Sequence, residues 1–346
     1  MKLAGICGHF GDGSHTDGQT VKTRILYEKL CEFCGEDNIA YADTNSWKKR
    51  IPQFLSSTIK LFKNSKNIII MPAFRGIRVF VPLYSFLNKF GKKKLHYIVI
   101  GGWLPKLLDE HPSMIKKLKK FDGIYVESNN MIEKLKAKGF NNVYYMPNFK
   151  NLEILDEPVE IQDKEPYKLC TFSRLVPLKG IDIAAHAVDY VNEQKERMVF
   201  KLDVYGAIHP QFTDWWSELE KSFSDAVSYA GVVPYDKTTG VLKDYYALLF
   251  PTLYKTEGMP GTILDAYSAG LPVIASEWQN SHDMIDDGKS GLLLDMDNVE
   301  EALKKTLLRL ADNPGELKPM RQASLNKAAR FLSDNVVKDF IKYLGE

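Results

Sequence analysis

The sequence contains little cysteine and no long apolar run. Only four of its 346 residues are cysteines, and Cys31 and Cys34 form a Cys-x-x-Cys pair without the second pair that a zinc site would need. The most apolar stretches, around residues 76–87 and 95–105, fall short of the roughly 18 residues of a membrane-spanning helix. Near the N-terminus, Gly8 and His9 interrupt the apolar residues too early for a signal peptide, which predicts a cytoplasmic protein.

Positive charge is concentrated in the first half of the chain. Residues 1–150 contain 25 Lys and Arg against 12 Asp and Glu, whereas residues 151–346 contain 21 against 32. A basic half can serve nucleic acid, an anionic membrane surface or a phosphorylated substrate. The sequence has no nucleic-acid motif and no basic face with regularly spaced aromatic residues, so we expect no nucleic-acid partner. Membrane lipid or an anionic substrate is favoured.

Length and pattern predict an α/β protein of two domains. The chain is longer than one hydrophobic core usually supports, and its 45% hydrophobic and 26% charged residues are typical of globular proteins. Short apolar runs alternate with helical patterns in both halves, as in parallel sheets covered by helices. We expect strands at Lys2–Cys7, Asn67–Met71, His96–Ile100, Gly123–Glu127, Asn142–Met146, Lys168–Phe172, Phe200–Tyr205, Val227–Ala230, Ala247–Pro251, Pro272–Ser276 and Gly291–Leu294.

A linker separates the two halves. Residues 151–165 are acidic, and Pro158 and Pro166 lie in or beside them. We therefore place one Rossmann-like domain at residues 1–155, a second at 156–330, and an amphipathic helix at 331–346. Ligands of open parallel sheets bind beyond the C-terminal strand ends, so two such sheets facing each other predict an active site in the cleft between them.

Two cations follow the first strand of the second half. Arg174 and Lys179 lie between the strand Lys168–Phe172 and a helix predicted from Ile181. Backbone N–H groups point outward at a helix N-terminus, and an Arg and a Lys beside them can hold a diphosphate. Taken alone, the two residues also fit a solvated loop.

Two carboxylates mark a second element downstream. Glu257 precedes a predicted helix and Asp265 lies in its second turn, while Pro260 suits its first turn. The helix N-terminus favours anions, and acids at two depths can accept hydrogen bonds from hydroxyls of one elongated ligand. Each acid alone also fits a surface or capping role; together with the two upstream cations they predict a ligand site.

These elements together resemble a known family. In order they are Arg174-x4-Lys179-Gly180, Gly231-Val232-Val233, Glu257-x7-Asp265 and Ala269-Gly270-Leu271-Pro272-Val273. Over about residues 168–300 they resemble the retaining glycosyltransferases of the GT-B fold, family 4 (glycosyl transferases group 1), including members of bacterial capsule, lipopolysaccharide O-antigen and exopolysaccharide assembly. The resemblance implies two Rossmann-like domains and a C-terminal helix, here 331–346, that crosses back to the first.

The resemblance also implies roles for single residues. Arg174 and Lys179 would hold the donor diphosphate, and Glu257 would lie at the transferred sugar. The second acid of the family pattern is a glutamate that binds ribose; here it is Asp265, one methylene shorter, so that either direct contact or a bridging water fits. The donor-binding residues implied by the resemblance are Gly18, Gln19, Val232, Val233, Gly258, Met259, Pro260, Gly261 and Asp265.

A glycine-rich loop opens the first predicted helix. Its glycines allow close approach of backbone to a ligand, and residues 18–23 resemble the loop that borders donor phosphate and acceptor in polysaccharide-assembly members. His9 and His15 are candidate acceptor residues or ordinary loop histidines. Many relatives have a histidine after the fourth strand, where this sequence has Gly101-Gly102-Trp103; Trp103 is either an acceptor platform or a core residue.

The implied reaction is that of a hexosyltransferase of class EC 2.4. A sugar would pass from a nucleotide diphosphate sugar to a carbohydrate or lipid-linked sugar acceptor with retention of anomeric configuration. Arg174, Lys179 and a helix N-terminus would assist departure of the diphosphate, so we expect no metal and no other cofactor. The usual proposal for the family is front-face attack without a protein nucleophile.

The basic half suggests where the acceptor is carried. Residues 47–63 mix aromatic, aliphatic and basic side chains as interfacial helices do, although an ordinary packed helix with a solvated lysine face has the same composition. We expect peripheral association with the inner face of the plasma membrane through this basic domain. Further lysines that add charge are Lys92, Lys93, Lys94, Lys116, Lys117, Lys119 and Lys120.

Three other functions fit parts of the sequence. An NAD-dependent oxidoreductase would use the glycine loop with an acid such as Asp43 at the end of a second strand, but it leaves Arg174, Lys179 and Glu257 without a role. A nucleotide-sugar-binding protein would bind without turnover. An epimerase on the same scaffold is the third alternative.

Overall fold

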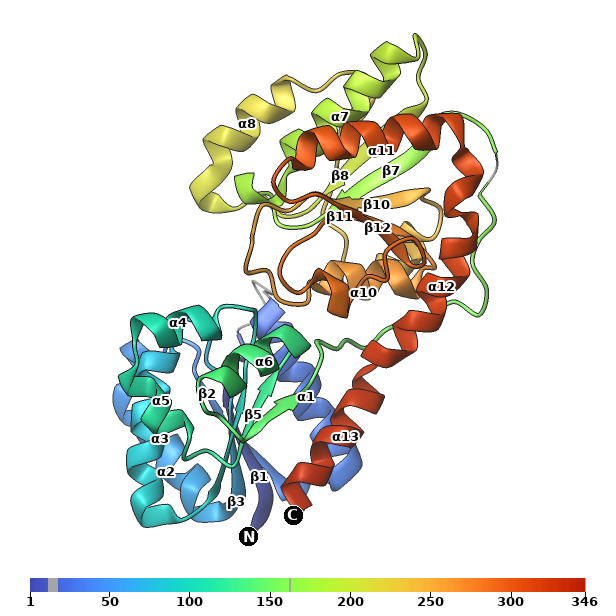
Figure 1. The fold of residues 1–346 in the computed structure, drawn as a ribbon. Coiled ribbons are helices and arrows are strands. Elements are labelled where there is room, and N and C mark those ends of the chain that lie inside the picture. Colours follow the sequence, from blue (N-terminus) through green and yellow to red (C-terminus); the bar gives the residue numbers. More distant parts are fainter. Residues whose placement is uncertain (12–17, 162, 346) are drawn as a thin grey trace. The chain divides into compact units, whose positions relative to one another are not determined.

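The computed structural model describes residues 1–11, 18–161 and 163–345, which form two compact units (Figure 1). Unit 1 comprises Met1–Asn151 and Arg330–Glu346, and unit 2 comprises Leu152–Ala329. Each unit has its own six-stranded parallel sheet within the described residues. Both sheets confirm the expected α/β class.

The sheet of unit 1 has the strand order β2-β1-β3-β4-β5-β6. One side is covered by helices α2 to α6, and α1 and α13 pack on the other side. The strands are β1 (Lys2–Gly8), β2 (Ile39–Asp43), β3 (Ser65–Ile70), β4 (Lys94–Ile98), β5 (Gly123–Val126) and β6 (Val143–Tyr145). The helices are α1 (Gly18–Cys34), α2 (Ile51–Asn64), α3 (Ile77–Gly91), α4 (Leu104–Glu110), α5 (Ser113–Leu118), α6 (Asn129–Ala137) and α13 (Ser333–Gly345), with short η1 (Glu36–Asn38), η2 (Trp47–Lys49) and η7 (Ala329–Phe331).

The sheet of unit 2 has the order β12-β11-β10-β7-β8-β9. Its core is built mainly from the apolar faces of α7 and α11 against the sheet. The strands are β7 (Tyr167–Phe172), β8 (Phe200–Tyr205), β9 (Val227–Gly231), β10 (Ala247–Phe250), β11 (Val273–Ser276) and β12 (Gly291–Leu294). The helices are α7 (Ile181–Gln194), α8 (Thr213–Lys221), α9 (Thr238–Leu242), α10 (Gly261–Ser268), α11 (Val299–Asp312) and α12 (Lys318–Ala328), with short η3 (Pro177–Lys179), η4 (Pro210–Phe212), η5 (Ser281–Asp283) and η6 (Pro314–Leu317).

The C-terminal helix α13 packs in unit 1. Its residues Val337 and Phe340 are buried in the cluster that contains Ile25 and Leu26 of α1. The Asn67 side chain donates a 2.9 Å hydrogen bond to the Leu344 carbonyl at the end of α13. Both apolar packing and a buried polar contact therefore fix this helix on the sheet.

Candidate functional site

The sheet of unit 2 reverses its strand order at β7. The chain passes from β7 to β8 on one side, and later returns to place β10 on the other side of β7. In open parallel sheets, ligands bind outside the C-terminal strand ends at such a switch point. The loops that follow β7 and β10 contain Arg174, Lys179 and Glu257.

Lys179 and Glu257 form an ion pair at this edge. The Lys179 Nζ lies 2.6 Å from the Glu257 Oε2, and the two side chains are only 10% and 19% exposed. The ammonium also lies over the rings of Phe250 and Tyr254, 4.9 and 5.3 Å from their centres. A cation held by one carboxylate and two aromatic faces has its orientation set before any ligand arrives.

Other side chains hold Glu257 in place. The Thr252 hydroxyl donates a 3.3 Å hydrogen bond to the Glu257 Oε2, and Asn280 Nδ2 donates a 2.6 Å hydrogen bond to the Glu257 carbonyl. Trp278 Nε1 donates to the Gly258 carbonyl at 3.2 Å. These three supporting residues were not predicted from the sequence, where their only signal is that each lies within four residues of the end of a strand.

Gly180 explains why the two loops meet. Its φ is +68°, and a Cβ at this position would lie 2.1 Å from the Pro251 carbonyl oxygen. Only glycine allows the start of α7 to approach the end of β10 this closely. The close approach brings Lys179, one residue earlier, beside the Glu257 loop.

Arg174 lies exposed at the same edge. Among the described residues its side chain has no hydrogen-bond or ion-pair partner, in contrast to Lys179. Val232 and Val233 follow β9, and Val232 is largely exposed. Gly258 and Met259 are buried, while Pro260 is the N-cap of α10, whose helix starts at Gly261.

Asp265 is buried in the second turn of α10. It is 4% exposed, and its Oδ1 accepts a 3.2 Å hydrogen bond from the Thr238 hydroxyl of α9. The carboxylate thus links two helices, a structural role that was not predicted from the sequence.

The sheet of unit 1 has its own switch point at β1. His9, after β1, shares a 2.8 Å hydrogen bond between its Nδ1 and the Thr20 Oγ1. Gln19 Nε2 donates a 2.9 Å hydrogen bond to the Met71 carbonyl after β3. Gly18 starts α1 and is exposed. His15 lies outside the described residues.

A buried ion pair was not predicted at this edge. The Lys22 Nζ lies 2.7 Å from the Glu127 Oε1, and both side chains are almost fully buried. The Glu127 Oε2 accepts a 3.2 Å hydrogen bond from the Gly101 N–H, which ties α1, β5 and the loop after β4 together. In the sequence, this pair was indicated only by the position of Glu127, an acid directly after the apolar residues of β5.

The side chains of Trp103 and Asp43 form hydrogen bonds with backbone groups of unit 1. Trp103 is half-buried; its Nε1 donates a 2.7 Å hydrogen bond to the Ile100 carbonyl and its ring meets Phe74 edge-on. Asp43 ends β2, but its Oδ1 accepts hydrogen bonds from the N–H groups of Phe10 and Asn45. That use of the carboxylate argues against an NAD ribose site at Asp43.

Metal-binding groups are sparse. In the part of the chain that the structure describes, no group of three or more His, Cys, Asp or Glu side chains is arranged to hold a metal ion. The sequence Asp295-Met296-Asp297 follows β12, and its two acids are exposed. The Asp295 Oδ1 accepts a hydrogen bond from the Asp297 N–H, as in a turn.

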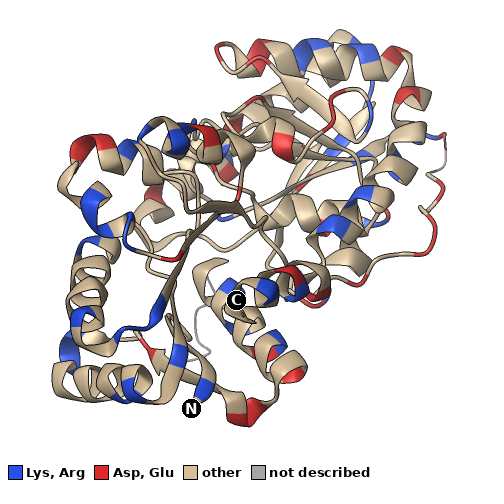
Figure 2. Cartoon of the chain, turned by 60° about the horizontal axis from the view of Figure 1, so that its bottom comes forward, with Lys and Arg blue, Asp and Glu red and all other residues tan. Residues whose placement is uncertain are grey.

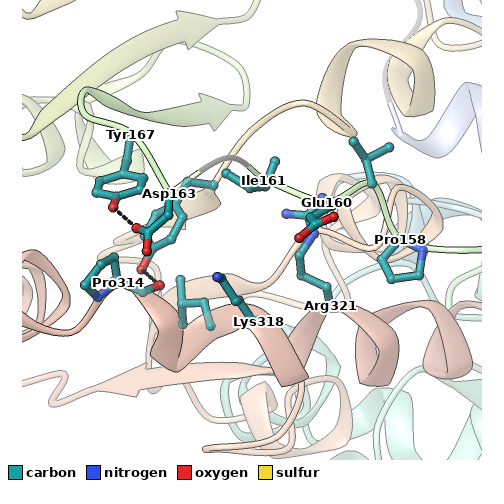
Figure 3. Close-up of a pocket in the computed structure, with 11 residues that line it drawn as sticks. Pro158, Glu160, Ile161, Asp163, Tyr167, Pro314, Lys318 and Arg321 are labelled. Atoms are coloured by element: carbon teal, nitrogen blue, oxygen red, sulfur yellow. Dashed lines mark hydrogen bonds between the residues drawn. The ribbon is translucent and has the colours of Figure 1, made fainter.

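A cavity of about 270 Å³ lies at the opposite edge of the unit 2 sheet (Figure 3). It is lined by the segment from Pro158 to Ile161, by Asp163 and Tyr167, and by Lys318 and Arg321 of helix α12. The Tyr167 hydroxyl donates to Asp163, and Arg321 donates to the carbonyls of Tyr245 and Lys243. Its mainly apolar lining sits at the N-terminal strand ends, away from Lys179 and Glu257, so it is not the site expected for a diphosphate.

The second unit matches a protein-family model. Residues 166–313, which include both switch-point loops, match glycosyl transferases group 1. These residues are a glycosyl transferases group 1 domain. The group 1 domain thus covers β7 to α11 and contains Arg174, Lys179, Glu257 and Asp265.

Two relatives that align with parts of this chain are named as glycosyltransferases. An uncharacterized glycosyltransferase of Methanocaldococcus jannaschii is 25% identical over 71% of this chain and 65% of its own length. The amylovoran biosynthesis glycosyltransferase AmsK of Erwinia amylovora is 25% identical over 47% of this chain and 40% of its own length. The aligned part of this chain therefore spans less than two thirds of either relative.

A solved structure is similar over the full chain. Anabaena HepE in complex with UDP has a TM-score of 0.76 at 13% identity, covering 100% of both chains. At that identity the likeness concerns the fold, which is GT-B. None of the helices in the described residues is both long and apolar enough to cross a membrane.

Proposed function

We propose that this chain transfers a sugar from a nucleoside diphosphate sugar to a carbohydrate acceptor. The observation that carries the proposal is the Lys179–Glu257 pair beside the exposed Arg174 at the switch point of a group 1 domain. Two cations at a helix entrance suit a diphosphate, and a carboxylate next to them suits sugar hydroxyls. Because HepE binds UDP, uridine diphosphate is the first leaving group to test.

The proposed reaction retains the anomeric configuration. An acceptor hydroxyl attacks the anomeric carbon from the face on which the diphosphate leaves, and the carbon–oxygen bond to the diphosphate breaks as the glycosidic bond forms. The hydroxyl proton passes to the departing diphosphate oxygen. Arg174 and Lys179 offset the negative charge that develops there, and Glu257 orients Lys179 while accepting a hydrogen bond from the sugar.

Two further features belong to the proposal. Since the protein's own cations would stabilise the diphosphate, turnover should not require a metal or another cofactor. The acceptor would be a lipid-linked sugar of cell-surface polysaccharide assembly, used at the cytoplasmic side of a membrane. The name of AmsK, an amylovoran biosynthesis enzyme, supports the polysaccharide class.

A thermal-shift titration tests donor binding. UDP, GDP, TDP, ADP and NAD are added with magnesium or with EDTA, since a ligand that prefers the folded state raises Tm. We expect UDP to raise Tm under both conditions, and the rise to disappear in Arg174→Ala. Lys201→Ala serves as the matched control, because it removes an exposed cation of β8. This variant should keep the UDP-induced rise in Tm. A shift with NAD alone would reject the donor site.

A turnover assay separates transfer from the two related alternatives. The chain is incubated with UDP-sugars and lipid-linked acceptors, and products are identified by mass spectrometry and by NMR of the anomeric proton. Transfer with retained configuration is expected, lowered at least a hundredfold in Glu257→Gln. Binding without turnover would identify a nucleotide-sugar-binding protein, and a UDP-sugar of altered stereochemistry would identify an epimerase.

A further inference from the structure

One long stretch of unit 1 contains no acid. Between Asp43 and Asp109 the chain has 13 Lys and Arg, and every Asp and Glu lies outside this stretch. The stretch includes both α2 and α3, so this flank of unit 1 shows only positive charge along the two helices (Figure 2). A surface of one sign this large favours a partner of the opposite sign.

The two helices lie side by side. Phe54 of α2 contacts Phe80 of α3, with ring centres 5.7 Å apart, and Phe62 contacts Tyr84 at 5.4 Å. Because both contacts keep the same order along the chain, the helices run parallel. Trp47 packs on Phe54 and Phe80 and so belongs to the core of unit 1 rather than to its surface.

Apolar side chains cover the outward faces of these helices. They recur every three or four residues or at twice that spacing, which places each row along one side of its helix, and they are 40% to 77% exposed. Helix α3 alone extends about 22 Å at 1.5 Å per residue. This apolar strip consists of Ile51, Leu55 and Ile59 of α2 and Val79, Phe86 and Phe90 of α3.

Unpaired cations surround the apolar strip. Lys89 lies over the ring of Phe86, with its Nζ 5.9 Å from the ring centre, so charge and apolar surface are adjacent. None of the exposed cations on or beside the two helices forms an ion pair within the described residues. These cations include Lys60, Lys63, Arg75, Arg78, Lys89 and Lys92.

We propose that the apolar strip docks on an anionic lipid bilayer. Its apolar side chains would enter the boundary between head groups and acyl chains, with the cations at the level of the lipid phosphates. A second copy of this chain is a poorer occupant, because it would bring the same cations face to face without any acid between them. The inference rests on the proposed function, since a bilayer would present the lipid-linked acceptor.

Vesicle sedimentation of the full chain tests the proposal. Vesicles of phosphatidylcholine alone and with 30% phosphatidylglycerol are compared in 0.1 M and 0.5 M salt. Binding should require the anionic lipid and weaken in high salt. Phe86→Ser/Phe90→Ser and Lys89→Gln/Lys92→Gln should each lower the partition coefficient about tenfold or more. Met198→Ser and Lys338→Gln/Lys342→Gln, on other exposed surfaces, should change it less than twofold.

The UDP thermal shift is measured on every variant. Because Phe86, Phe90, Lys89 and Lys92 are exposed in unit 1, these variants should fold and keep the shift, so loss of docking is distinguished from failure of the donor site. Equal binding to both vesicle types, or none, would overturn the proposal. So would concentration-dependent dimers abolished by Phe86→Ser/Phe90→Ser, or a soluble acidic protein that competes with vesicles through the same residues at lower concentration than lipid.

Discussion

At the scale of single residues, Gly180 links fold to site. Its left-handed backbone and the nearby Pro251 carbonyl leave no space for a side chain. We predict that Gly180→Ala lowers the free energy of unfolding by about 2 kcal/mol or more and weakens UDP binding, because the Lys179 loop must shift. Urea unfolding and the UDP titration measure both effects. Gly240→Ala, a change inside α9 where a Cβ meets nothing within 4 Å, should be neutral or stabilising.

His96 makes stability depend on pH. Its Nε2 lies 3.1 Å from the Asn67 Oδ1, and its Nδ1 lies 2.9 Å from the Tyr125 hydroxyl. Both hydrogens of the Asn67 amide go to the carbonyls of Leu3 and Leu344, so the Oδ1 accepts and the His96 Nε2 donates. Burial lowers the pKa of His96 from 6.5 to about 4, so the folded protein holds this ring neutral near pH 7.

The sign of the pH effect follows from proton binding. Between about pH 6.5 and pH 4 the unfolded chain binds a proton at His96 that the folded chain does not. This group should thus destabilise the fold as pH falls, by about 3 kcal/mol in total. Urea unfolding at pH 7, 5.5 and 4.5 should show a shallower pH slope in His96→Gln than in the wild type. An unchanged slope would contradict the assignment, and His186→Gln, at an exposed position, is the control.

At the scale of elements, α13 contributes to unit 1 through its apolar face. Phe340 is 2% exposed and its ring centre lies 4.8 Å from that of Tyr125. Phe340→Ala should cost about 3–5 kcal/mol, the range for removing a buried phenyl ring. Phe90→Ala removes the same ring from an exposed position and should cost less than about 0.5 kcal/mol. Comparable losses in the two variants would mean that α13 does not stabilise unit 1.

Most strands were predictable from short apolar or alternating runs. Phe200–Tyr205 and Gly291–Leu294 were predicted at the residues where the structure has them, and Gly206 and Asp295 mark where the two runs end. Strand β2, Ile39–Asp43, was missed as an element. It is an edge strand whose Tyr41 is 55% exposed, so it lacks the buried run typical of a central parallel strand.

The candidate site was only partly accessible from sequence. Spacing and helix signals indicated Lys179 and Glu257 as members of one site, but their 2.6 Å contact joins residues 78 positions apart and depends on the Gly180 approach. The helix-to-helix hydrogen bond of Asp265 could not be inferred, because its partner Thr238 belongs to a short helix without a strong pattern. The roles of these residues toward a donor stay predictions.

At the scale of the whole molecule, each unit has its own hydrophobic core. Local opening should therefore follow the boundaries of the units. In hydrogen exchange on the full chain, Phe340→Ala should accelerate exchange in β3 to β5 while leaving β7 and β10 unchanged, and Gly180→Ala should do the reverse. Uniform acceleration throughout the chain in either variant would show that the two cores open together.

Unit 1 is built from two separate segments of the chain, which affects the order in which it can fold during synthesis. Its sheet is translated first, whereas α13, which covers one of its faces, comes after all of Leu152–Ala329. At about 5–20 residues per second, the ribosome needs on the order of ten seconds or more to make that intervening segment. At the end of this interval unit 2 has every residue of its own core, while the nascent sheet of unit 1 still exposes the apolar surface that α13 will cover. Unit 2 can therefore fold before unit 1 is complete. We expect chaperones at the ribosome exit to bind the exposed apolar sheet of unit 1.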